Sequence, residues 1–226
     1  MKRGWFITFE GPEGSGKTTQ ARRLVQALQE QGYRVVLTRE PGGTPIGDQI
    51  RQVLLDHYNQ RMHPRTEGLL FQASRAQHVA EVICPKLEAG FVVVCDRFAD
   101  STLAYQGFGR GENLEDLRRL IAYATWGLAP HLTFLLDVPP ETGLRRRHGA
   151  QPLPGEEWNR LDAERLAFHQ AVRQGYRALA QAEPSRWVVL DGEQPIGVLQ
   201  QRILEVVATR LQSDAPPTAC SRVRWA

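Results

Sequence analysis

Gly11-Pro-Glu-Gly-Ser-Gly-Lys17-Thr18 is the stretch that decides the fold. It matches the phosphate-binding pattern G-x-x-x-x-G-K-[ST], follows a short apolar run and opens a helical pattern. Its glycines let the backbone curl with N–H groups pointing inward, and the following helix N-terminus adds positive potential there. We therefore predict a nucleotide-binding loop in which Lys17 reaches the β- and γ-phosphates and the Thr18 hydroxyl binds Mg²⁺. The residues expected to contact ATP are Gly11, Pro12, Glu13, Gly14, Ser15, Gly16, Lys17, Thr18 and Thr19.

Outward from this loop, short apolar runs alternate with longer helical patterns. The runs at 5–9, 33–37, 91–95, 132–137 and 187–190 are near-continuously apolar or β-branched, which is typical of strands covered on both faces. The alternation predicts an α/β protein with the P-loop NTPase fold, in which helices flank both faces of a five-stranded parallel sheet. Helices are expected at 17–31, from 44 onward, from 64 to just before 90, and at 114–126, 140–147, 161–182 and 195–211.

The length of 226 residues fits one large domain, which we place at 1–212. Residues 148–158 are rich in glycine and proline, a composition typical of a mobile surface loop. Residues 213–226 contain Pro216-Pro217 and small polar residues, and we expect a disordered tail there.

The charge of the chain is nearly balanced, with 28 basic and 25 acidic residues. A formal net charge of +3 does not indicate nucleic acid as a partner. No apolar run approaches the ~18 residues of a membrane span. We therefore expect small-molecule substrates and neither a nucleic acid nor a membrane partner.

The three cysteines are Cys84, Cys95 and Cys220, and their spacing shows no CxxC pair or disulfide framework. Because no disulfide pattern or apolar signal region is evident, we expect a cytoplasmic protein. Cys95 ends an apolar run, where a reduced, buried thiol is expected.

A carboxylate and an arginine follow the apolar run that starts at Phe91. In open α/β sheets ligands bind at the carboxyl ends of the strands, so Asp96 is predicted to hold Mg²⁺ or its waters. Arg97 is predicted to clamp a phosphate of either substrate. An aspartate at this place is equally typical of a turn or a cap, but the phosphate-binding loop favours the functional interpretation.

Four segments make the prediction more specific: 9–20 (FEGPEGSGKTTQ), 38–47 (TREPGGTPIG), 67–78 (EGLLFQASRAQH) and 96–110 (DRFADSTLAYQGFGR). They closely resemble bacterial thymidylate kinases and occur in the family's order, and the resemblance spans about residues 5 to 210. It implies ATP-dependent phosphorylation of dTMP to dTDP with Mg²⁺, usually by a homodimer.

The resemblance also implies roles for individual side chains. Phe71 would stack on thymine and Arg75 would hydrogen-bond its carbonyl edge. The i, i+4 spacing of these two residues agrees, because it places them on one helix face. From the residues alone, the favoured interpretation is that Phe71 belongs to the core and that Arg75 is its solvated neighbour. The resemblance implies further substrate-binding residues. Glu10 and Arg39 would lie near the acceptor and metal, Glu13 near the sugar 3′-hydroxyl, and Arg97 at a phosphate, while Ser101, Thr102, Tyr105 and Gln106 would surround the base and sugar. Apart from the family, Tyr105 and Gln106 indicate a turn.

Arginines flank the Gly- and Pro-rich segment, which corresponds to the family's lid over ATP at about 145–160. Because the phosphate-binding loop carries Glu13 and no arginine, we expect the lid to place a cation on the transferred phosphoryl group. Arg145 and Arg160 are the candidates, together with Lys17, Arg97 and Glu13 as the catalytic set. For Arg146 and Arg147 a solvated helix face is an equal alternative.

Two other features belong to the resemblance. The lid contains a longer Gly/Pro stretch than is usual, and Asn159 stands where an aspartate is common. Near the C-terminus, the segment 191–195 (DGEQP) resembles the loop that borders adenine, which is a weaker match.

The implied chemistry needs no strong base, because a phosphate monoester with a second pKa near ~6 is already largely dianionic at neutral pH. Stabilisation of charge on the transferring group is the greater need. Three alternatives stay open: a kinase for another monophosphate or deoxynucleoside, a catalytically silent nucleotide-binding regulator, and a GTPase switch. An intact Lys17, Thr18, Asp96 and Arg97 disfavour the regulator, and the lack of an N-K-x-D segment disfavours the switch.

Overall fold

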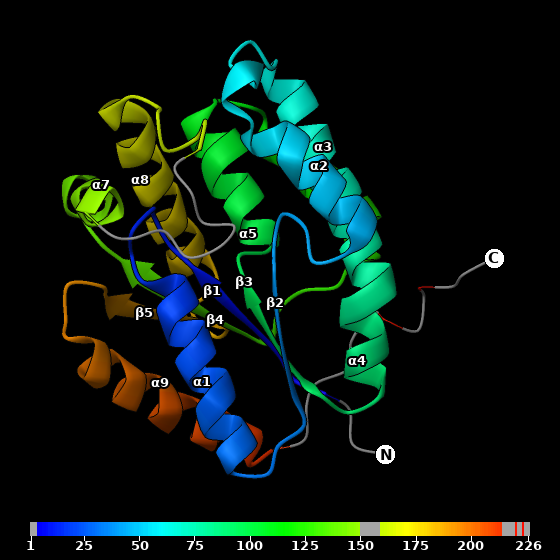
Figure 1. Cartoon of the computed structure of the whole chain (residues 1–226). Coiled ribbons are helices and arrows are strands. Elements are labelled where there is room, and N and C mark those ends of the chain that lie inside the picture. Colours follow the sequence, from blue (N-terminus) through cyan, green and yellow to red (C-terminus); the bar gives the residue numbers. More distant parts are fainter. Residues whose placement is uncertain (1–3, 150–158, 214–219, 221–222, 224–226) are drawn as a thin grey trace.

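The structure is a computed structural model and describes residues 4–149 and 159–213 together with Cys220 and Val223. Five parallel strands form one sheet in the order β2-β3-β1-β4-β5 (Figure 1). This confirms the predicted fold class. The strands are β1 (Phe6–Glu10), β2 (Val35–Arg39), β3 (Val92–Asp96), β4 (Leu132–Asp137) and β5 (Trp187–Asp191).

Helices cover both faces of the sheet. The α-helices described are α1 (Lys17–Glu30), α2 (Pro45–Leu55), α3 (Pro64–His78), α4 (Cys84–Glu88), α5 (Ala99–Thr102), α6 (Leu114–Thr125), α7 (Pro140–Gly149), α8 (Leu166–Ala182) and α9 (Ile196–Leu211). Shorter helical segments are the 3₁₀ turn η1 (His57–Asn59) and the π-helical η2 (Val79–Ile83) and η3 (Leu103–Gly109).

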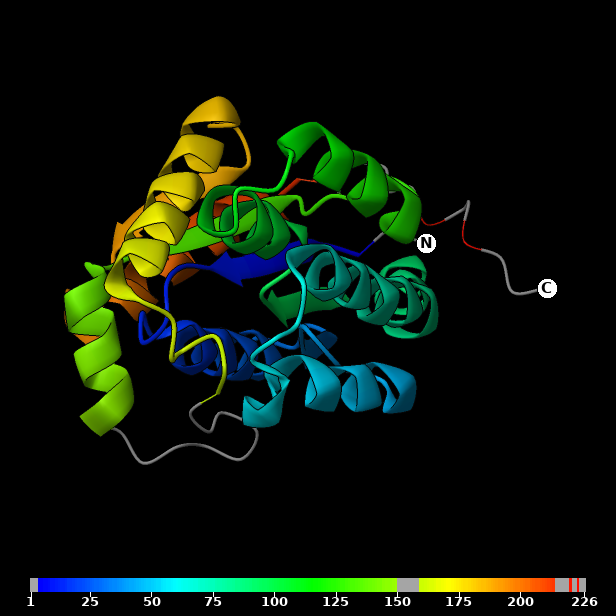
Figure 2. The same ribbon diagram turned by 90° about the horizontal axis from the view of Figure 1, so that it is seen from above.

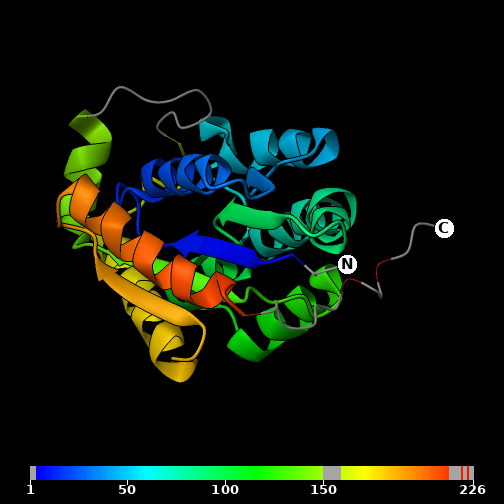
Figure 3. The ribbon, with the colours of Figure 1, turned by 90° about the horizontal axis from the view of Figure 1, so that it is seen from below.

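Alternation along the strands divides the core between the two faces, since successive side chains of a strand point to opposite sides. Ile7 and Phe9 of β1 pack with Leu24 of α1 and Ile203 of α9 on one face, which Figure 3 shows from below. Phe6 packs on the other face with Val79, Ile83 and Leu87, and α6 and α8 lie on that side too (Figure 2). The carboxyl ends of the strands stay uncovered between these layers.

Most predicted elements are confirmed within two residues. The helical run from Pro64 is continuous through α3, η2 and α4. Two predictions were wrong. Tyr105 and Gln106, expected in a turn on their residues alone, lie in the buried π-helical η3. The helix expected from 161 starts at Leu166, because Asp162 accepts hydrogen bonds that hold the preceding turn.

The cysteines correct another expectation. Cys84 at the start of α4 forms a disulfide with Cys220, although the cysteine spacing did not indicate a pair. The two residues are 136 positions apart, so no local spacing signals their contact. Cys95 is free and buried, as predicted. Apart from Ser213, Cys220 and Val223, the tail expected at 213–226 lies outside the described residues. Of the loop expected at 148–158, His148 and Gly149 instead end α7, and the rest lies outside the described residues.

Among the described residues, no helix combines the length and the apolar character needed to cross a bilayer.

Candidate active site

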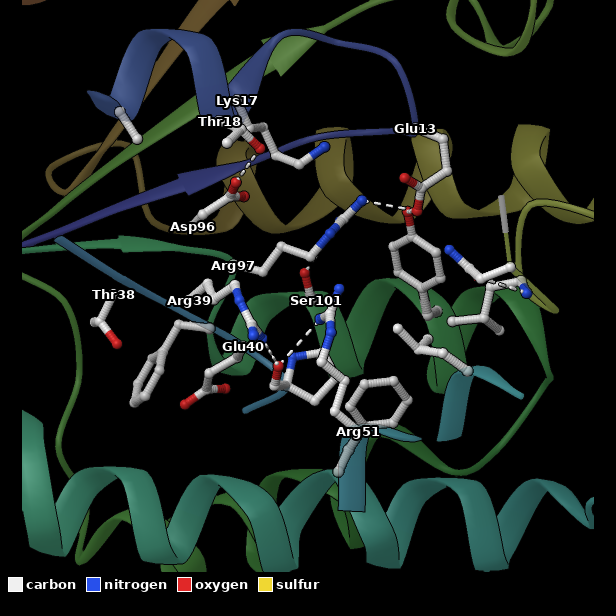
Figure 4. A pocket seen from close by; sticks show the side chains of 18 of the residues that line it. Glu13, Lys17, Thr18, Thr38, Arg39, Glu40, Arg51, Asp96, Arg97 and Ser101 are labelled. Carbon is white, nitrogen blue, oxygen red and sulfur yellow. Dashed lines mark hydrogen bonds and ion pairs between the residues drawn. The ribbon is translucent and has the colours of Figure 1, made fainter. Parts of the chain in front are cut away.

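A cavity of about 600 Å³ opens at the carboxyl ends of β1, β2 and β3 (Figure 4). This is the edge at which open parallel sheets bind ligands. Its lining joins the phosphate-binding loop to the residues predicted for the base. The predicted residues that line it are Glu13, Gly14, Gly16, Lys17, Thr18, Thr19, Arg39, Phe71, Arg75, Asp96, Arg97, Ser101, Thr102, Tyr105 and Gln106, whereas Glu10, Gly11, Pro12 and Ser15 are buried and are not part of its lining.

The phosphate-binding loop connects β1 to α1 and folds around Lys17. The Lys17 ammonium donates to the carbonyl oxygens of Gly11 (3.1 Å) and Pro12 (2.8 Å). Burial and the nearby Arg97 lower the pKa of Lys17 to about 8, so the ammonium is still charged at neutral pH. The Lys17 ammonium can therefore donate to phosphate oxygens in place of these carbonyl oxygens.

Helix α7 lies directly against this loop through a pair of glycines. A Cβ on Gly14 would lie 2.0 Å from the carbonyl oxygen of Gly143, and a Cβ on Gly143 would lie 2.1 Å from that of Glu13. Only glycine on both sides permits so close a backbone approach. The arginines at the end of α7 are therefore held beside the donor end of the cavity.

Thr18 and Asp96 meet as predicted. The Thr18 hydroxyl donates to the Asp96 carboxylate at 2.5 Å, beside Lys17 (Figure 4). A hydroxyl and a carboxylate oxygen are ligands that suit Mg²⁺. No group of three or more metal-binding side chains gathers in the part of the chain that the structure describes. The protein side chains could thus supply only part of a coordination shell, as in sites where Mg²⁺ is bound largely by phosphates and waters.

Arg97 lies at the centre of the cavity. Its backbone is left-handed, with φ of 68°, a strained conformation for a residue other than glycine. One Nη donates to Glu13 at 2.8 Å and the other to the Gly11 carbonyl oxygen at 3.0 Å. Burial opposes the charge of Glu13, but Arg97 and Lys17 outweigh it and lower the pKa of Glu13 to about 2. Glu13 therefore stays ionised, and Tyr105 donates a further hydrogen bond to it at 2.7 Å.

Glu10, at the end of β1, lies behind Arg97 in a different environment. It accepts hydrogen bonds from Ser101 (2.6 Å), from Tyr176 (2.9 Å) and from the backbone N–H of Phe98 (2.8 Å). Burial and the neighbouring negative charge of Asp100 nevertheless raise the pKa of Glu10 to about 7. Two carboxylates only three residues apart in sequence thus have opposite shifts, set by their surroundings.

Tyr176 is a site residue that the sequence analysis missed. It is fully buried on α8, and its hydroxyl also lies 3.1 Å from Arg97 and 2.7 Å from Ser101. Along the sequence it is one apolar position of an amphipathic helix, so nothing distinguishes it from a core residue.

Two further arginines, Arg39 and Arg51, lie at the part of the cavity away from Lys17 (Figure 4). Arg39 donates to the Pro41 carbonyl oxygen at 2.8 Å and to Asp48 at 3.2 Å. Arg51 of α2, which was not predicted, donates to the same carbonyl at 3.1 Å and lines the cavity. Burial and the repulsion of Arg39 lower the pKa of Arg51 to about 10. Its position on the helix that follows the TREPGG segment was the signal available in the sequence.

The base end of the cavity holds Phe71 and Arg75 on one face of α3. Phe71 is half-buried and lines the cavity, and Arg75 is only 1% exposed. The alternative of a solvated Arg75 is therefore wrong. Thr102 accepts from Arg75 at 2.9 Å, and Gln106 donates its amide N–H to the buried Glu67 at 2.8 Å.

The arginines of the predicted lid are placed differently from the expectation. Arg146 and Arg147 line the cavity, whereas Arg145 is exposed and does not. Arg160 is buried away from the cavity, where it pairs with Glu67 at 2.6 Å. The structure therefore places Arg146 and Arg147, and not Arg145 and Arg160, at the cavity, and which of the four contacts the transferred phosphoryl group stays a prediction.

Nearby contacts hold the two arginines that do line the cavity. Arg146 donates to the Gly192 carbonyl oxygen at 2.7 Å, which brings α7 against the 191–195 segment. Arg147 pairs with Asp162 at 3.2 Å, and Asp162 also accepts from the backbone N–H of Asn159. Contact of the 191–195 segment with adenine stays a prediction.

The site combines three features: a loop that can bind phosphate, a hydroxyl–carboxylate pair beside it, and arginines along the rest of the cavity. These features define the class of P-loop nucleotide kinases. Within this class, the sequence model of the thymidylate kinase family matches residues 9–203. The chain therefore belongs to the thymidylate kinase family.

Individual relatives agree. The thymidylate kinase of Roseiflexus castenholzii is 54% identical over 216 residues, covering 92% of this chain and 94% of the relative. Those of Herpetosiphon aurantiacus and Bacillus pumilus are 51% and 46% identical and cover 89% and 93% of this chain and 94% and 98% of the relatives.

Proposed function

We propose how this chain carries out the reaction of its family, the transfer of the γ-phosphoryl group of ATP to dTMP. The observation that carries the assignment is one continuous cavity, with Lys17 at one end, Phe71 and Arg75 at the other and Arg97 between them. ATP would bind with its phosphates in the loop. dTMP would bind with thymine at Phe71 and its phosphate toward Arg97 and Arg39.

The chain's own contribution to the chemistry is electrostatic. An oxygen of the dTMP phosphate attacks the γ-phosphorus, and the bond from that phosphorus to the bridging oxygen of ADP breaks. Lys17 and Arg97 would stabilise the charge on the transferring group, and Arg146 or Arg147 would add a cation from α7. Glu13, ionised and bound by Arg97 and Tyr105, is placed to accept the sugar 3′-hydroxyl. No proton-abstracting base is needed.

We further propose Mg²⁺ as the cofactor. The donor set fits, because the Thr18 hydroxyl and the Asp96 carboxylate lie together beside the loop. When bound, Mg²⁺ would neutralise charge on the donor phosphates. Thr18 and Asp96 would hold the ion or its waters.

We also propose a homodimer. Exposed apolar side chains on three helices support it: Ile46 and Val53 on α2, Leu69 on α3 and Tyr123 on α6. Helix α3 packs against both α2 and α6. Sedimentation at twice the mass of one chain would support the dimer, and sedimentation at the mass of one chain would contradict it.

A cytoplasmic location is proposed because ATP is the donor. The Cys84–Cys220 disulfide argues in the other direction, since such bonds are rare in reducing compartments. Mass mapping of the two cysteines in protein isolated with thiols blocked would decide whether the bond exists in the cell.

ADP release with ATP, Mg²⁺ and each of dTMP, dUMP, dCMP, dAMP and dGMP tests the activity. We expect strong dependence on dTMP. Equal release with and without acceptor would indicate an ATPase, and preference for another monophosphate would overturn the thymine assignment.

A further inference from the structure

Arg75 reads the base in the proposed function, and its guanidinium is almost fully held by the protein. Nη1 donates to Gln72 (2.8 Å) and Thr102 (2.9 Å), and Nη2 donates to the Phe98 carbonyl oxygen (3.0 Å). Nε donates to Glu40 at 2.7 Å. A guanidinium has five N–H donors, so one N–H on Nη2 is left without a partner among the described residues. The direction of that donor depends on the other four bonds.

Among the residues that the structure describes, Glu40 is the one charged partner of Arg75, and it has contacts of its own. Its side chain is 3% exposed, and both of its oxygens are used. The oxygen that does not bind Arg75 lies 3.1 Å from Nδ1 of His78, which is fully buried. Because an ionised carboxylate only accepts, Nδ1 carries the proton and donates to Glu40.

The chain of contacts continues from His78 to β2. Nε2 of His78 lies 2.6 Å from the hydroxyl of Thr38. The series Thr38, His78, Glu40, Arg75 is one connected set of hydrogen bonds. Thr38 and Glu40 both line the cavity (Figure 4).

The backbone is built to accommodate this series. Thr38 and Glu40 are two residues apart at the end of β2, and Arg75 and His78 are i and i+3 on α3, so each pair shares a face. Gly43, with φ of +85°, lies against the middle of the series. A Cβ there would come within 2.8 Å of His78 Nε2 and 2.9 Å of the Thr38 hydroxyl. The second glycine of the TREPGG segment thus leaves room for the Thr38–His78 hydrogen bond.

We propose that Thr38, His78 and Glu40 are positioning residues that orient Arg75 and thereby set the preference for thymine over cytosine. The proposal rests on the proposed role of Arg75 as the donor to the thymine 4-carbonyl. Cytosine carries an amino group at that position and offers no acceptor to a fixed N–H. A guanidinium held rigidly rejects it, whereas a loosened one tilts toward other acceptors of the ring.

The test is steady-state kinetics of the full chain with saturating ATP and with dTMP or dCMP as acceptor. Glu40→Gln keeps the shape of the side chain and removes its charge. We expect the KM for dTMP to rise by about 10-fold or more, as for loss of a charged hydrogen bond. The ratio of kcat/KM for dTMP to that for dCMP should fall by a similar factor, while the KM for ATP changes less than about twofold.

Thr38→Val removes only the Thr38 hydroxyl, at the end of the series away from Arg75. It should raise the KM for dTMP and lower the dTMP-to-dCMP ratio of kcat/KM by about 3-fold each, in line with loss of a neutral hydrogen bond. It also keeps the test decisive if Glu40→Gln does not fold. Glu81→Gln is the matched control, because Glu81 is an exposed carboxylate in η2 that accepts a hydrogen bond from Gln77 and does not line the cavity. It should leave both quantities unchanged.

Arg75→Ala separates the possible failures. If Arg75→Ala leaves the KM for dTMP unchanged, the proposed role of Arg75 is wrong. If Arg75→Ala raises it but Glu40→Gln and Thr38→Val leave the dTMP-to-dCMP ratio intact, the positioning role is overturned. Agreement requires that Glu40→Gln adds little in the Arg75→Ala background. A uniform loss of kcat with all acceptors and a lower Tm would also overturn it, because it indicates stability alone.

Discussion

At the base end of the cavity, Arg75 is 1% exposed and bonds to four protein groups, whereas at the α7 end Arg146 is exposed and bonds to one backbone carbonyl. The base end is therefore preorganised, and an acceptor can bind there with little loss of side-chain entropy. At the α7 end, Arg146 contacts the Gly192 carbonyl oxygen and Arg147 pairs with Asp162. The comparison shows that the fold holds Arg75 more completely than Arg146, and we propose that the donor-side cation is delivered on binding.

Arg97 lies between the two ends, and its removal should have the largest effect. Arg97→Ala deletes the cation that contacts both Glu13 and the loop, and we expect kcat to fall by about 10³-fold or more. The measurement is ADP release with dTMP. Arg23→Ala, an exposed arginine on α1, is the control and should retain full activity. A loss of less than about tenfold would place the essential charge elsewhere.

Substitution of Arg160 tests whether this arginine contributes to stability or to catalysis. Among the described residues, Arg160→Ala leaves the buried Glu67 with Arg110 and Gln106 as partners, so the free energy of unfolding should fall by about 3 kcal/mol. The kcat of the folded variant should change by only a few-fold. Urea unfolding and single-turnover rates measure the two effects.

The exposed Arg119→Ala, whose ion pairs lie on the surface of α6, is the control and should cost less than about 1 kcal/mol. If Arg160→Ala keeps wild-type stability but loses about 10³-fold in kcat, Arg160 is a catalytic residue after all.

The acids of the phosphate-binding region give a prediction with a defined sign. Because the pKa of Glu10 is raised from 4.5 to about 7, the native state binds more protons than the unfolded state between these values. Stability should therefore fall as pH rises through this window, by roughly 2 to 3 kcal/mol between pH 5 and 8, relative to Glu10→Gln. Glu13 does not interfere, since its lowered pKa affects stability only as pH falls below about 5.

Urea unfolding of wild type and Glu10→Gln at pH 5, 6, 7 and 8 measures this difference. Parallel pH dependences of the two proteins would show that the native pKa of Glu10 is ordinary.

The contrast between the two ends also shows what sequence can predict. The phosphate-binding loop, the strands and Asp96 were predictable because each is a local pattern in a known order along the chain. Arg160 was misplaced because its partner, Glu67, lies on a distant helix, and sequence neighbourhood to the lid says nothing about a buried carboxylate.

Tyr176 and Arg51 were missed for a related reason. Each occupies an ordinary position of a helical pattern, and only the packing of α8 and α2 against the cavity gives it a role. The disulfide between Cys84 and Cys220 likewise depends on a contact that no spacing encodes.

The smallest expected effect belongs to the α7 end. Arg147→Ala removes a side chain that lines the cavity and pairs with Asp162, and we expect kcat to fall by about 10-fold with little change in the KM for dTMP. Arg145→Ala, two residues earlier on the same helix, removes an exposed arginine outside the cavity and is the matched control. If the donor-side cation comes from α7, the loss should grow when Arg146→Ala is added to Arg147→Ala. If instead Arg145→Ala is the more damaging single change, the order of these side chains differs in the nucleotide-bound enzyme, and α7 must turn when ATP binds.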